Sequence, residues 1–323
     1  MKFKISHSLY KLKAPRAVQT GLLLKLENSD NGDRGYCAVQ PHPHLGDPTV
    51  DQILVELNAG RLSQLTRAGL DFARFGWIRA KNQFQTKPFL FRCENNFLIQ
   101  HMEDLVPFSL LEAKQLKFHT VKFKITTFDA DKITQALEVA KGHGLKVRLD
   151  PNGKLNPNQA ISYFRALPGD LRDVIDYLED PFPYSEAHWR ELNTYVPLAN
   201  DFFWQEAMLG LDNLPFQNLI LKPVRHTQST WQTLAKFPKP ISLTSSMDHP
   251  IGILQALSFL ALNKQSHWSL IHGLNTFTSF EPISYDHMFD YSSPVLELRP
   301  NAFLLALKLL EEETWRYACE LTL

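Results

Sequence analysis

The chain has 323 residues, of which 44% are hydrophobic and 21% are charged, and its 34 Lys and Arg balance 34 Asp and Glu. This length exceeds the usual size of a single domain, so we expect one large barrel or two associated domains. The balanced charge argues against the broad electropositive surface that nucleic-acid binding requires. A small molecule is therefore the expected partner.

Cysteine usage and the pattern of apolar residues predict a soluble cytoplasmic protein. Cys37, Cys93 and Cys319 are far apart and odd in number, which fits no disulfide framework or zinc spacing. The sequence contains no run of about 18 apolar residues, and its N-terminus alternates polar and apolar residues. We expect reduced thiols, no membrane association and no obligate protein partner.

The first 95 residues predict a small α+β unit. Its expected elements are strands at 2–13, 20–27 and 35–39 and helices at 48–58 and 61–82. Asp47-Pro48 is typical of a helix start, with an N-cap followed by proline in the first turn. His42 and His44 in the preceding loop have the alternating spacing of some metal ligands, but surface loops carry such histidines more often without metal.

From about residue 96, short apolar runs alternate with amphipathic stretches. The runs recur at intervals of about 20 to 30 residues, which predicts a parallel β/α barrel of eight strands. The expected strands are 97–100, 121–125, 145–149, 174–178, 196–199, 219–221, 241–244 and 268–271. The expected helices are 108–117, 129–142, 156–167, 185–194, 227–236 and 250–263, and a last helix at 300–318 follows the barrel.

Alternation within the second predicted strand separates its lysines from its apolar residues. Lys122 and Lys124 lie on one face, whereas Val121, Phe123 and Ile125 lie on the other. Taken alone, this pattern is typical of a half-buried strand with a solvated row of lysines. The residues that end the following strands favour a functional interpretation.

Acidic residues end three successive predicted strands, and a lysine ends the next. Asp150, Glu179 and Asp201 are separated by about one β/α unit each, and Lys222 follows at a similar interval. Each acid on its own is a common turn, strand-end or helix-cap residue. Their regular spacing favours one shared site, because the strand ends of a β/α barrel meet at its C-terminal face.

These residue types suit proton abstraction next to a carboxylate. A set of carboxylate ligands without Cys or His suits a hard divalent cation such as Mg²⁺. Such a cation binds a substrate carboxylate and neutralises the charge that grows on it when the adjacent carbon loses a proton. A lysine then makes a suitable base, because the metal and a neighbouring ammonium group lower its pKa.

The chain resembles the enolase superfamily in its muconate-lactonizing-enzyme-like subgroup, and within it most resembles the o-succinylbenzoate synthase family. The resemblance extends over nearly the whole chain and includes the Lys-x-Lys strand and the Lys222-Pro223 strand end. Other matching segments are Leu149 to Asn152 (Leu-Asp-Ala-Asn in the family), Tyr177 to Pro181 (Phe-Leu-Glu-Glu-Pro), Ser245-Ser246 (Ser-Ser) and His272 to Thr276 (Pro-Gly-Leu-Asp-Thr).

The resemblance implies an α/β fold, a modified (β/α)7β TIM-type barrel with an α+β capping domain. The barrel would span residues 96–289, and the cap would combine residues 1–95 with a C-terminal tail at about 290–323. Carried over by position, the Mg²⁺ ligands (with Mn²⁺ as an alternative) would be Asp150, Glu179 and Asp201. Lys124 would be the acid/base, Lys122 its partner near the substrate carboxylate, and Lys222 the lysine across the site. Substrate contacts would come from Asn152, Ser245, Ser246 and, in a mobile loop at 14–20, Arg16.

The implied reaction is a syn dehydration in menaquinone biosynthesis, catalysed by a carbon-oxygen lyase. Its substrate would be 2-succinyl-6-hydroxy-2,4-cyclohexadiene-1-carboxylate and its product o-succinylbenzoate. The same residues serve an isomerase of the superfamily equally well, such as an N-succinylamino acid racemase, a dipeptide epimerase or a muconate cycloisomerase. A non-catalytic binding barrel would predict erosion of the acids and lysines, all of which are present.

Departures from the family pattern bear on the substrate and leave the acid and lysine set unaffected. Val39 replaces an acidic residue, Phe202 replaces a glutamate, and Gly153 replaces a common arginine. Neighbouring residues of this kind orient ligands and substrate. His272 stands where the family has proline and is an open candidate for substrate contact, while His226 is expected to be a helix-cap or surface residue.

Overall fold

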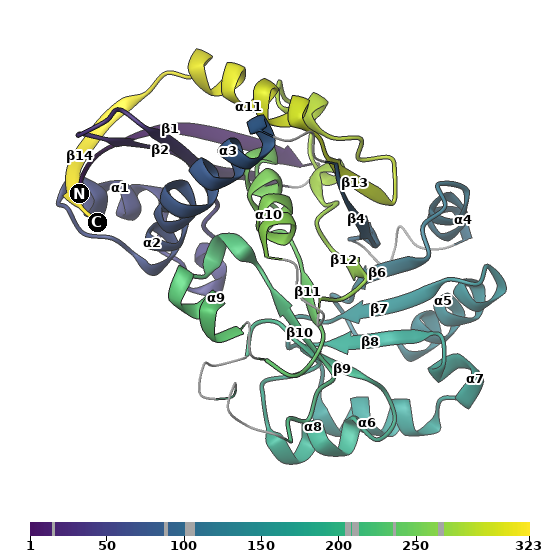
Figure 1. The fold of residues 1–323 in the computed structure, drawn as a ribbon. Helices are drawn as coiled ribbons and strands as arrows, with labels where there is room; N and C mark the ends of the chain where they lie inside the picture. The colour runs from purple at the N-terminus through teal and green to yellow at the C-terminus, as the bar shows by residue number, and fades with distance from the viewer. Residues whose placement is uncertain are drawn as a thin grey trace.

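The computed structural model describes residues 1–14, 17–86, 90–100, 107–203, 208, 213–234, 237–263 and 268–323. Its strands form a four-stranded sheet, a seven-stranded sheet and a three-stranded sheet. The four-stranded sheet lies to one side of the strands and helices of the rest of the chain (Figure 1). Within the described residues, no helix combines the length and apolar character needed to cross a membrane.

The four-stranded sheet joins both ends of the described chain. It is antiparallel in the order β14-β1-β2-β3, with β1 at Lys2–Ala14, β2 at Ala17–Asn28, β3 at Arg34–Val39 and β14 at Arg316–Thr322. The N- and C-termini therefore lie side by side (Figure 1). The hairpin of β1 and β2 is paired as far as Ala14 and Ala17, so most of the expected mobile loop at 14–20 is strand.

The expected helix at 300–318 is wrong only over its last six residues, 313–318. Helix α11 ends at Glu312, and residues 316–322 pair with β1 as β14. The apolar periodicity of the helix continues weakly past Glu312, but pairing with β1 recruits the tail into the sheet. Such pairing depends on a partner about 300 residues away, so local periodicity cannot reveal it.

The two helices expected in the cap are both present, and the second is a continuous helical run over residues 64–86. The elements are α1 (Val50–Asn58), α2 (Gln64–Asp71) and α3 (Ile78–Thr86), with a π-helical stretch at Phe72–Trp77 between α2 and α3. A Cβ atom at Gly35 would lie 2.0 Å from the Ala73 backbone oxygen, so only glycine allows this close approach. Thr49 caps α1 in a reciprocal pair with Gln52, so the expected N-cap at Asp47 is wrong.

The barrel strands follow the predicted order. The seven-stranded sheet is parallel, in the order β11-β10-β9-β8-β7-β6-β5. Its strands are β5 (Phe97–Ile99), β6 (Thr120–Lys124), β7 (Lys146–Asp150), β8 (Ile175–Glu179), β9 (Leu198–Asn200), β10 (Asn218–Leu221) and β11 (Ile241–Leu243). The three-stranded sheet contains β12 (Ile271–His272), β4 (Phe91–Asn95) and β13 (Val295–Leu298).

Strand β12 closes the ring of strands. It pairs in parallel with β4, which continues through Asn96 into β5, and two parallel bridges, Ile241 to Trp268 and Thr244 to Gly273, link the segment around it to β11. The eight predicted strands are therefore all present, although the last begins at Ile271. The predicted fold class, a β/α barrel with an added α+β region, is confirmed.

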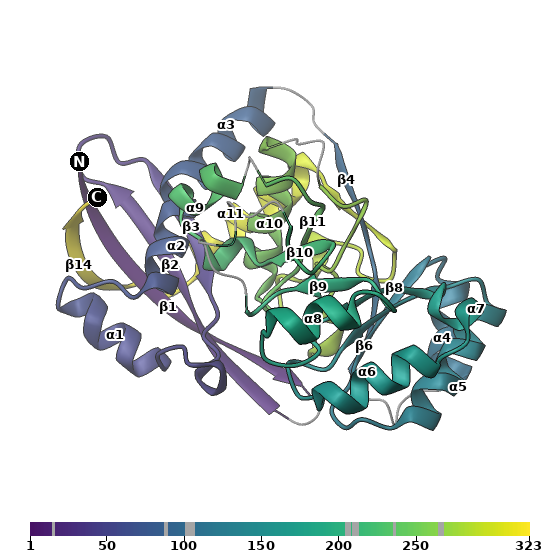
Figure 2. The ribbon, with the colours of Figure 1, turned by 90° about the horizontal axis from the view of Figure 1, so that it is seen from below.

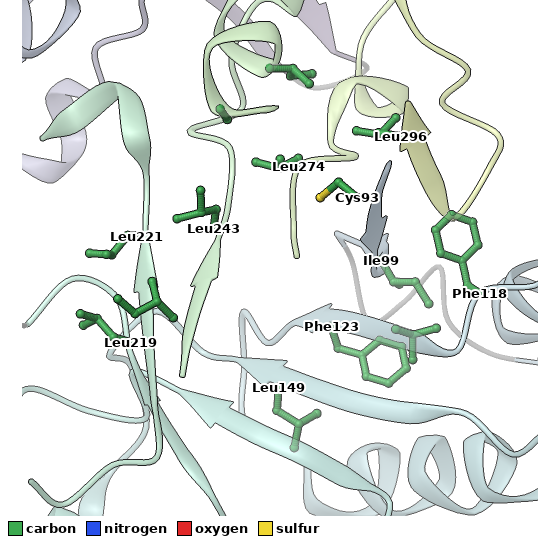
Figure 3. Close-up of a cluster of buried hydrophobic side chains, with 14 of the residues drawn as sticks. Cys93, Ile99, Phe118, Phe123, Leu149, Leu219, Leu221, Leu243, Leu274 and Leu296 are labelled. Carbon is green, nitrogen blue, oxygen red and sulfur yellow. The ribbon is translucent and has the colours of Figure 1, made fainter. Parts of the chain in front are cut away.

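Helices cover the outside of the barrel strands (Figures 1 and 2), and buried apolar side chains form a core cluster among these elements. The helices are α4 (Pro107–Gln115), α5 (Ala130–Gly142), α6 (Pro157–Ala166), α7 (Gly169–Arg172), α8 (Glu186–Leu192), α9 (Gln228–Leu234), α10 (Pro250–Leu262) and α11 (Pro300–Glu312). Short 3-10 helices lie at Pro43–Leu45, Pro223–Arg225, Phe277–Ser279 and Asp286–Met288. Figure 3 shows Phe123, Leu149, Leu219 and Leu243 in the buried apolar cluster. Burying each such side chain contributes about 1.5 to 3 kcal/mol.

Candidate active site

A cavity of about 1060 Å³ lies where the carboxyl ends of the barrel strands meet a loop of the cap. Its lining includes Lys122, Lys124, Asn152, Asp201, Lys222, Ser245 and Ser246, all predicted from the sequence, together with His42, His44 and Asp47 of the cap loop. Asp150 and Glu179 are each only 1% exposed and lie against these lysines. Arg16, expected to contact the substrate, lies outside the described residues.

Lys122 is buried between two of the predicted acids. Its Nζ donates to both carboxylate oxygens of Glu179 at 2.7 Å, and it lies 2.8 Å from Oδ2 of Asp150. Burial alone would lower the pKa of Lys122, but the charges of Asp150 and Glu179 outweigh it and raise that pKa well above its usual value. Lys122 therefore stays an ammonium group at neutral pH.

The two acids around Lys122 have pKa values shifted in opposite directions. Burial and the nearby charge of Asp150 raise the pKa of Glu179 to about 7. Burial would also raise the pKa of Asp150, but Lys122 and Lys124 lower it well below its usual value. Asp150 is therefore ionised at neutral pH, whereas Glu179 loses its proton only as the pH approaches neutrality.

Lys124 and Lys222 occupy opposite ends of the row of strand ends. The ammonium group of Lys124, on β6, contacts Asp150 and donates to Oδ1 of Asn152 at 3.2 Å. The ammonium group of Lys222, after β10, contacts Asp201. Strands β7, β8 and β9 separate these two lysines, and both side chains line the cavity. A molecule in this cavity therefore has an amine available on either side.

The donor set suits a hard divalent cation. Among the described residues, no three His, Cys, Asp or Glu side chains are already grouped to hold a metal, and the predicted acids contact lysines instead. Four carboxylates, those of Asp150, Glu179, Asp180 and Asp201, nevertheless lie near one another, and burial together with the charges of Asp150 and Asp201 raises the pKa of Glu179. Oxygen ligands with surplus negative charge fit Mg²⁺.

Asp180 was missed in the sequence because strand alternation assigns it to the face opposite Glu179. Its φ of 42° is in the left-handed region, and its buried carboxylate accepts the backbone N–H groups of Asp201 at 3.0 Å and Phe202 at 2.7 Å. Burial, with the charges of Asp201 and Glu179, raises the pKa of Asp180 well above its usual value. A pair of adjacent acids at a strand end was the signal that could have identified it.

Arg148 is a second missed residue, buried in the barrel interior below Lys122. Its Nε donates to Asp176 at 2.7 Å, and its guanidinium lies 4.7 Å from the centre of the Tyr177 ring. Arg148 and Asp150 are two residues apart on β7, so their side chains point to the same face. The inward direction of Arg148 was therefore predictable from the same alternation.

The cap loop is fastened to the barrel by polar contacts. The Asp47 carboxylate accepts the backbone N–H of His42 at 2.8 Å and the Arg225 guanidinium at 2.5 Å. Nε2 of His42 lies 2.7 Å from the carbonyl oxygen of Ser246, so this nitrogen donates to the barrel. This hydrogen bond occupies Nε2 of His42, one of the two ring nitrogens through which His42 could bind a metal together with His44. Asp47 thus closes the cavity, whereas the sequence suggested a helix cap.

Neutral side chains also hold the cap on the barrel, in a group that we call the docking cluster: Tyr10, Gln40, His249, Gln255 and Tyr285. The His249 ring lies 4.7 Å from that of Tyr10 and 4.4 Å from that of Tyr285 between centroids. The Tyr10 hydroxyl donates to Gln40 at 2.9 Å, and Oε1 of Gln255 accepts a backbone N–H of β3 at 2.8 Å. Burial lowers the pKa of His249 to about 3, which keeps it uncharged.

The remaining candidates differ in their exposure to the cavity. The Ser246 hydroxyl has no hydrogen-bond partner within the described chain and lines the cavity, whereas the Ser245 hydroxyl contacts Thr276. His272 is buried in the barrel wall, where its Nδ1 accepts the N–H of Leu243 at 3.0 Å. His226, expected at a helix cap or the surface, is the C-cap of the 3-10 helix Pro223–Arg225, and it is half-buried and lines the cavity.

The fold places this chain with capped β/α-barrel enzymes. Over 92% of its length it superimposes on 97% of a dipeptide epimerase from Enterococcus faecalis V583, with a TM-score of 0.74 at 14% identity. It also superimposes over 92% of its length on 95% of a mandelate racemase/muconate lactonizing protein from Herpetosiphon aurantiacus, with a TM-score of 0.73 at 14% identity. At these identities the likeness establishes the fold.

Sequence comparison gives the nearer relationship. Residues 5–76 match the family described as O-succinylbenzoate synthase, N-terminal domain. The chain is also 28% identical to an o-succinylbenzoate synthase from Bdellovibrio bacteriovorus, over 97% of its own length and 98% of that protein. The chain is therefore similar in sequence to o-succinylbenzoate synthases, and the predicted resemblance to them is confirmed.

Proposed function

We propose that this protein is an o-succinylbenzoate synthase. It would dehydrate 2-succinyl-6-hydroxy-2,4-cyclohexadiene-1-carboxylate to o-succinylbenzoate in menaquinone biosynthesis, with Mg²⁺ as the cofactor and Mn²⁺ as an alternative. The observation that carries the proposal is the position of Lys124 and Lys222 on two sides of one cavity, beside buried carboxylates. The similarity to o-succinylbenzoate synthases supports the dehydratase among the superfamily's reactions.

Lys124 carries out both proton transfers in this proposal. As a neutral amine it takes the proton from the ring carbon that bears the carboxylate, and the electrons of the C–H bond move into an enolate. The enolate then expels the ring hydroxyl from the same face, and Lys124 returns the proton to the departing oxygen. Water leaves, a new double bond completes the aromatic ring, and Lys124 is restored as an amine.

Lys222 and Lys122 supply fixed positive charge. The Lys222 ammonium group faces the opposite side of the cavity and stabilises the delocalised negative charge of the enolate. Lys122 remains protonated between Asp150 and Glu179, so it acts near the substrate carboxylate as a charge and not as a base. Of these three lysines, Lys124 alone then moves protons in the proposed dehydration.

Asp150, Glu179 and Asp201 would hold the cation, because they supply oxygen ligands from three successive strand ends. When bound, Mg²⁺ supplies positive charge against the second negative charge that develops on the substrate carboxylate. Asn152 would orient the substrate beside Lys124, and Ser246, which lines the cavity, would be a further substrate contact. Arg16 and Ser245 remain proposed substrate contacts.

We place the cap at residues 1–95 with the tail at 290–323, and the barrel at 96–289. The pairing of β14 with β1 supports the inclusion of the tail, and the cap loop at 42–47 lines the cavity. The substrate would be a small carboxylate, without nucleic acid or membrane. Three buried free thiols, Cys37, Cys93 and Cys319, support a reducing cytoplasmic location.

An isomerase is the second candidate, because amines on two sides of a ligand also suit removal and return of a proton on opposite faces. Racemization of N-succinylamino acids, dipeptide epimerization and muconate cycloisomerization are its forms. The structural similarity to a dipeptide epimerase is at the level of the fold and does not favour this candidate over the dehydratase.

One experiment separates the two candidates. The purified full chain with Mg²⁺ is given the cyclohexadiene substrate, and product formation is followed by absorbance. The same protein is incubated in D₂O with both enantiomers of an N-succinylamino acid, and exchange of the α-proton is followed by NMR. We expect rapid dehydration and slow or absent exchange. Efficient exchange of both enantiomers without dehydration would replace the dehydratase with the racemase.

A further inference from the structure

Asp180 connects the loops that follow three successive strands. Its side chain is 3% exposed, and its carboxylate accepts the N–H groups of Asp201 and Phe202 in the loop after β9. Its own carbonyl oxygen accepts the N–H of Gly153, in the loop after β7, at 2.7 Å. Because Asp180 itself follows β8, it contacts the loops after β7 and β9 from the position between them.

The backbone at Asp180 directs the carboxylate toward the loop after β9. Its φ of 42° lies in the left-handed region that few residues other than Gly, Asn and Asp adopt. An extended residue following Glu179 would direct its side chain to the opposite face of the strand. The left-handed turn is therefore what allows Glu179 to face Lys122 while its neighbour binds the next loop.

The loop after β9 also packs back on the loop after β7. A Cβ atom at Gly153, which has a φ of 75°, would lie 2.9 Å from the ring of Phe203. Glycine at this position lets the ring lie close to the backbone. The three loops are thus joined twice, by the contacts of Asp180 and by the packing of Phe203 on Gly153.

We propose that Asp180 is a positioning residue that sets the spacing of the three carboxylates Asp150, Glu179 and Asp201. The inference rests on the proposed function only in taking these three as Mg²⁺ ligands. They come from separate loops, and a metal site tolerates ligand distances within only about 0.2 Å. Both oxygens of Asp180 accept backbone N–H groups of the loop that carries Asp201, so Asp180 acts through the position of Asp201.

Two substitutions test the role without imposing a backbone clash. Asp180→Asn keeps the shape and tolerates the left-handed conformation, but its amide nitrogen would face one of the two N–H donors. Asp180→Gly keeps the positive φ without strain and removes the carboxylate. The matched control is Asp286→Asn, which alters a carboxylate that accepts the N–H of Ile283 at 2.9 Å and lines a different cavity.

The primary measurement is Mg²⁺ binding to the purified full chain by isothermal titration calorimetry, with near-UV circular dichroism to show that each variant is folded. We expect both Asp180 variants to bind Mg²⁺ about 10- to 100-fold more weakly than wild type, as is typical when an outer-shell contact is lost. Asp286→Asn should bind it as wild type does. Dehydration by Asp180→Asn should recover when the Mg²⁺ concentration is raised, because the groups that move protons are unchanged.

Three outcomes would overturn the proposal. One is an unchanged Mg²⁺ affinity in folded Asp180→Asn and Asp180→Gly. Another is loss of the near-UV signal in both variants even with Mg²⁺ in excess, which would make Asp180 a general stability residue. The third is wild-type protein that binds no Mg²⁺. Wild-type protein that binds Mg²⁺ but does not dehydrate the cyclohexadiene would refute the proposed function alone, because calorimetry still tests Asp180.

Discussion

The mouth of the barrel is held on two sides by different kinds of contact. At the strand ends from β6 to β10, buried carboxylates and ammonium groups lie against one another, as in the contacts of Lys122 with Asp150 and Glu179. In the docking cluster, the cap meets α10 through aromatic rings, amides and an uncharged histidine. One side concentrates charge, and the other avoids it.

This difference separates chemistry from assembly. Burying a charge costs free energy, and a carboxylate without a matching positive charge keeps that cost until a cation or a substrate binds beside it. The charged side is therefore suited to binding ligands. The neutral side chains of the docking cluster hold the cap without that cost. Substitutions on the charged side should therefore change catalysis more than stability, and substitutions in the docking cluster should do the reverse.

The largest effect is expected for Lys124→Ala. Dehydration should fall by at least about 10³-fold, because the side chain that moves the proton in both directions is lost. The turnover number with saturating substrate and Mg²⁺ is the measurement. Lys132→Ala, on the exposed surface of α5, serves as the control and should keep full turnover. A Lys124→Ala enzyme with more than a tenth of wild-type turnover would contradict the assignment of the base.

Glu179→Gln should weaken Mg²⁺ binding more than about 100-fold, beyond the loss typical of an outer-shell change. In wild type, the pKa of Glu179 is raised to about 7 from an ordinary value of 4.5. Its contribution to stability is therefore full below pH 4.5 and is lost as the pH rises to about 7. Metal-free Glu179→Gln should gain stability relative to wild type over that interval, as urea unfolding at several pH values would measure.

Local patterns predicted more of the barrel than of the cap. Alternation in β6 correctly separated Lys122 from Phe123, and the spacing of strand ends brought Asp150 and Glu179 to the same lysine. These are consequences of a two-residue period and a repeated β/α unit, both of which are visible in a sequence.

The missed features depend on partners that are distant in sequence or on a single dihedral angle. Pairing of β14 with β1 and the contact of Asp47 with Arg225 join segments that no local period connects. The side-chain direction of Asp180 follows from its positive φ, which alternation in β8 does not predict. The docking cluster likewise forms only when cap and barrel are packed together.

A smaller effect, with the opposite pH dependence, is expected for His249→Asn. The pKa of His249 is lowered to about 3, so its contribution is present above its unfolded value of 6.5 and is lost as the pH falls toward 3. Asparagine can still cap α10 but does not titrate. The stability of the variant relative to wild type should therefore improve by about 1.4 kcal/mol for each pH unit below 6.5. Asp248 titrates in both proteins, so its effect on the difference in stability cancels. A difference in stability between variant and wild type that does not change with pH would show that His249 is not held neutral.

The smallest effect is expected for Gln255→Ala. Its loss leaves the backbone N–H of Ala38 buried without an acceptor, which costs about 1 to 3 kcal/mol. Urea unfolding should show this destabilisation, while turnover with saturating substrate should stay within about twofold of wild type, because no charged group is disturbed. The control is Gln159→Ala, which shortens an exposed side chain on α6. A large loss of turnover in Gln255→Ala would show that the docking cluster also shapes the catalytic side.

The pairing of β1 with β14 imposes an order on biosynthesis. Strand β1 leaves the ribosome before the barrel, and β14 follows only after every strand of the barrel has been translated. One edge of the cap sheet therefore remains open during that time, when unpaired strand edges can pair with the wrong partner. Completion of the cap is thereby coupled to completion of the barrel, so a prematurely terminated chain would expose the β1 edge.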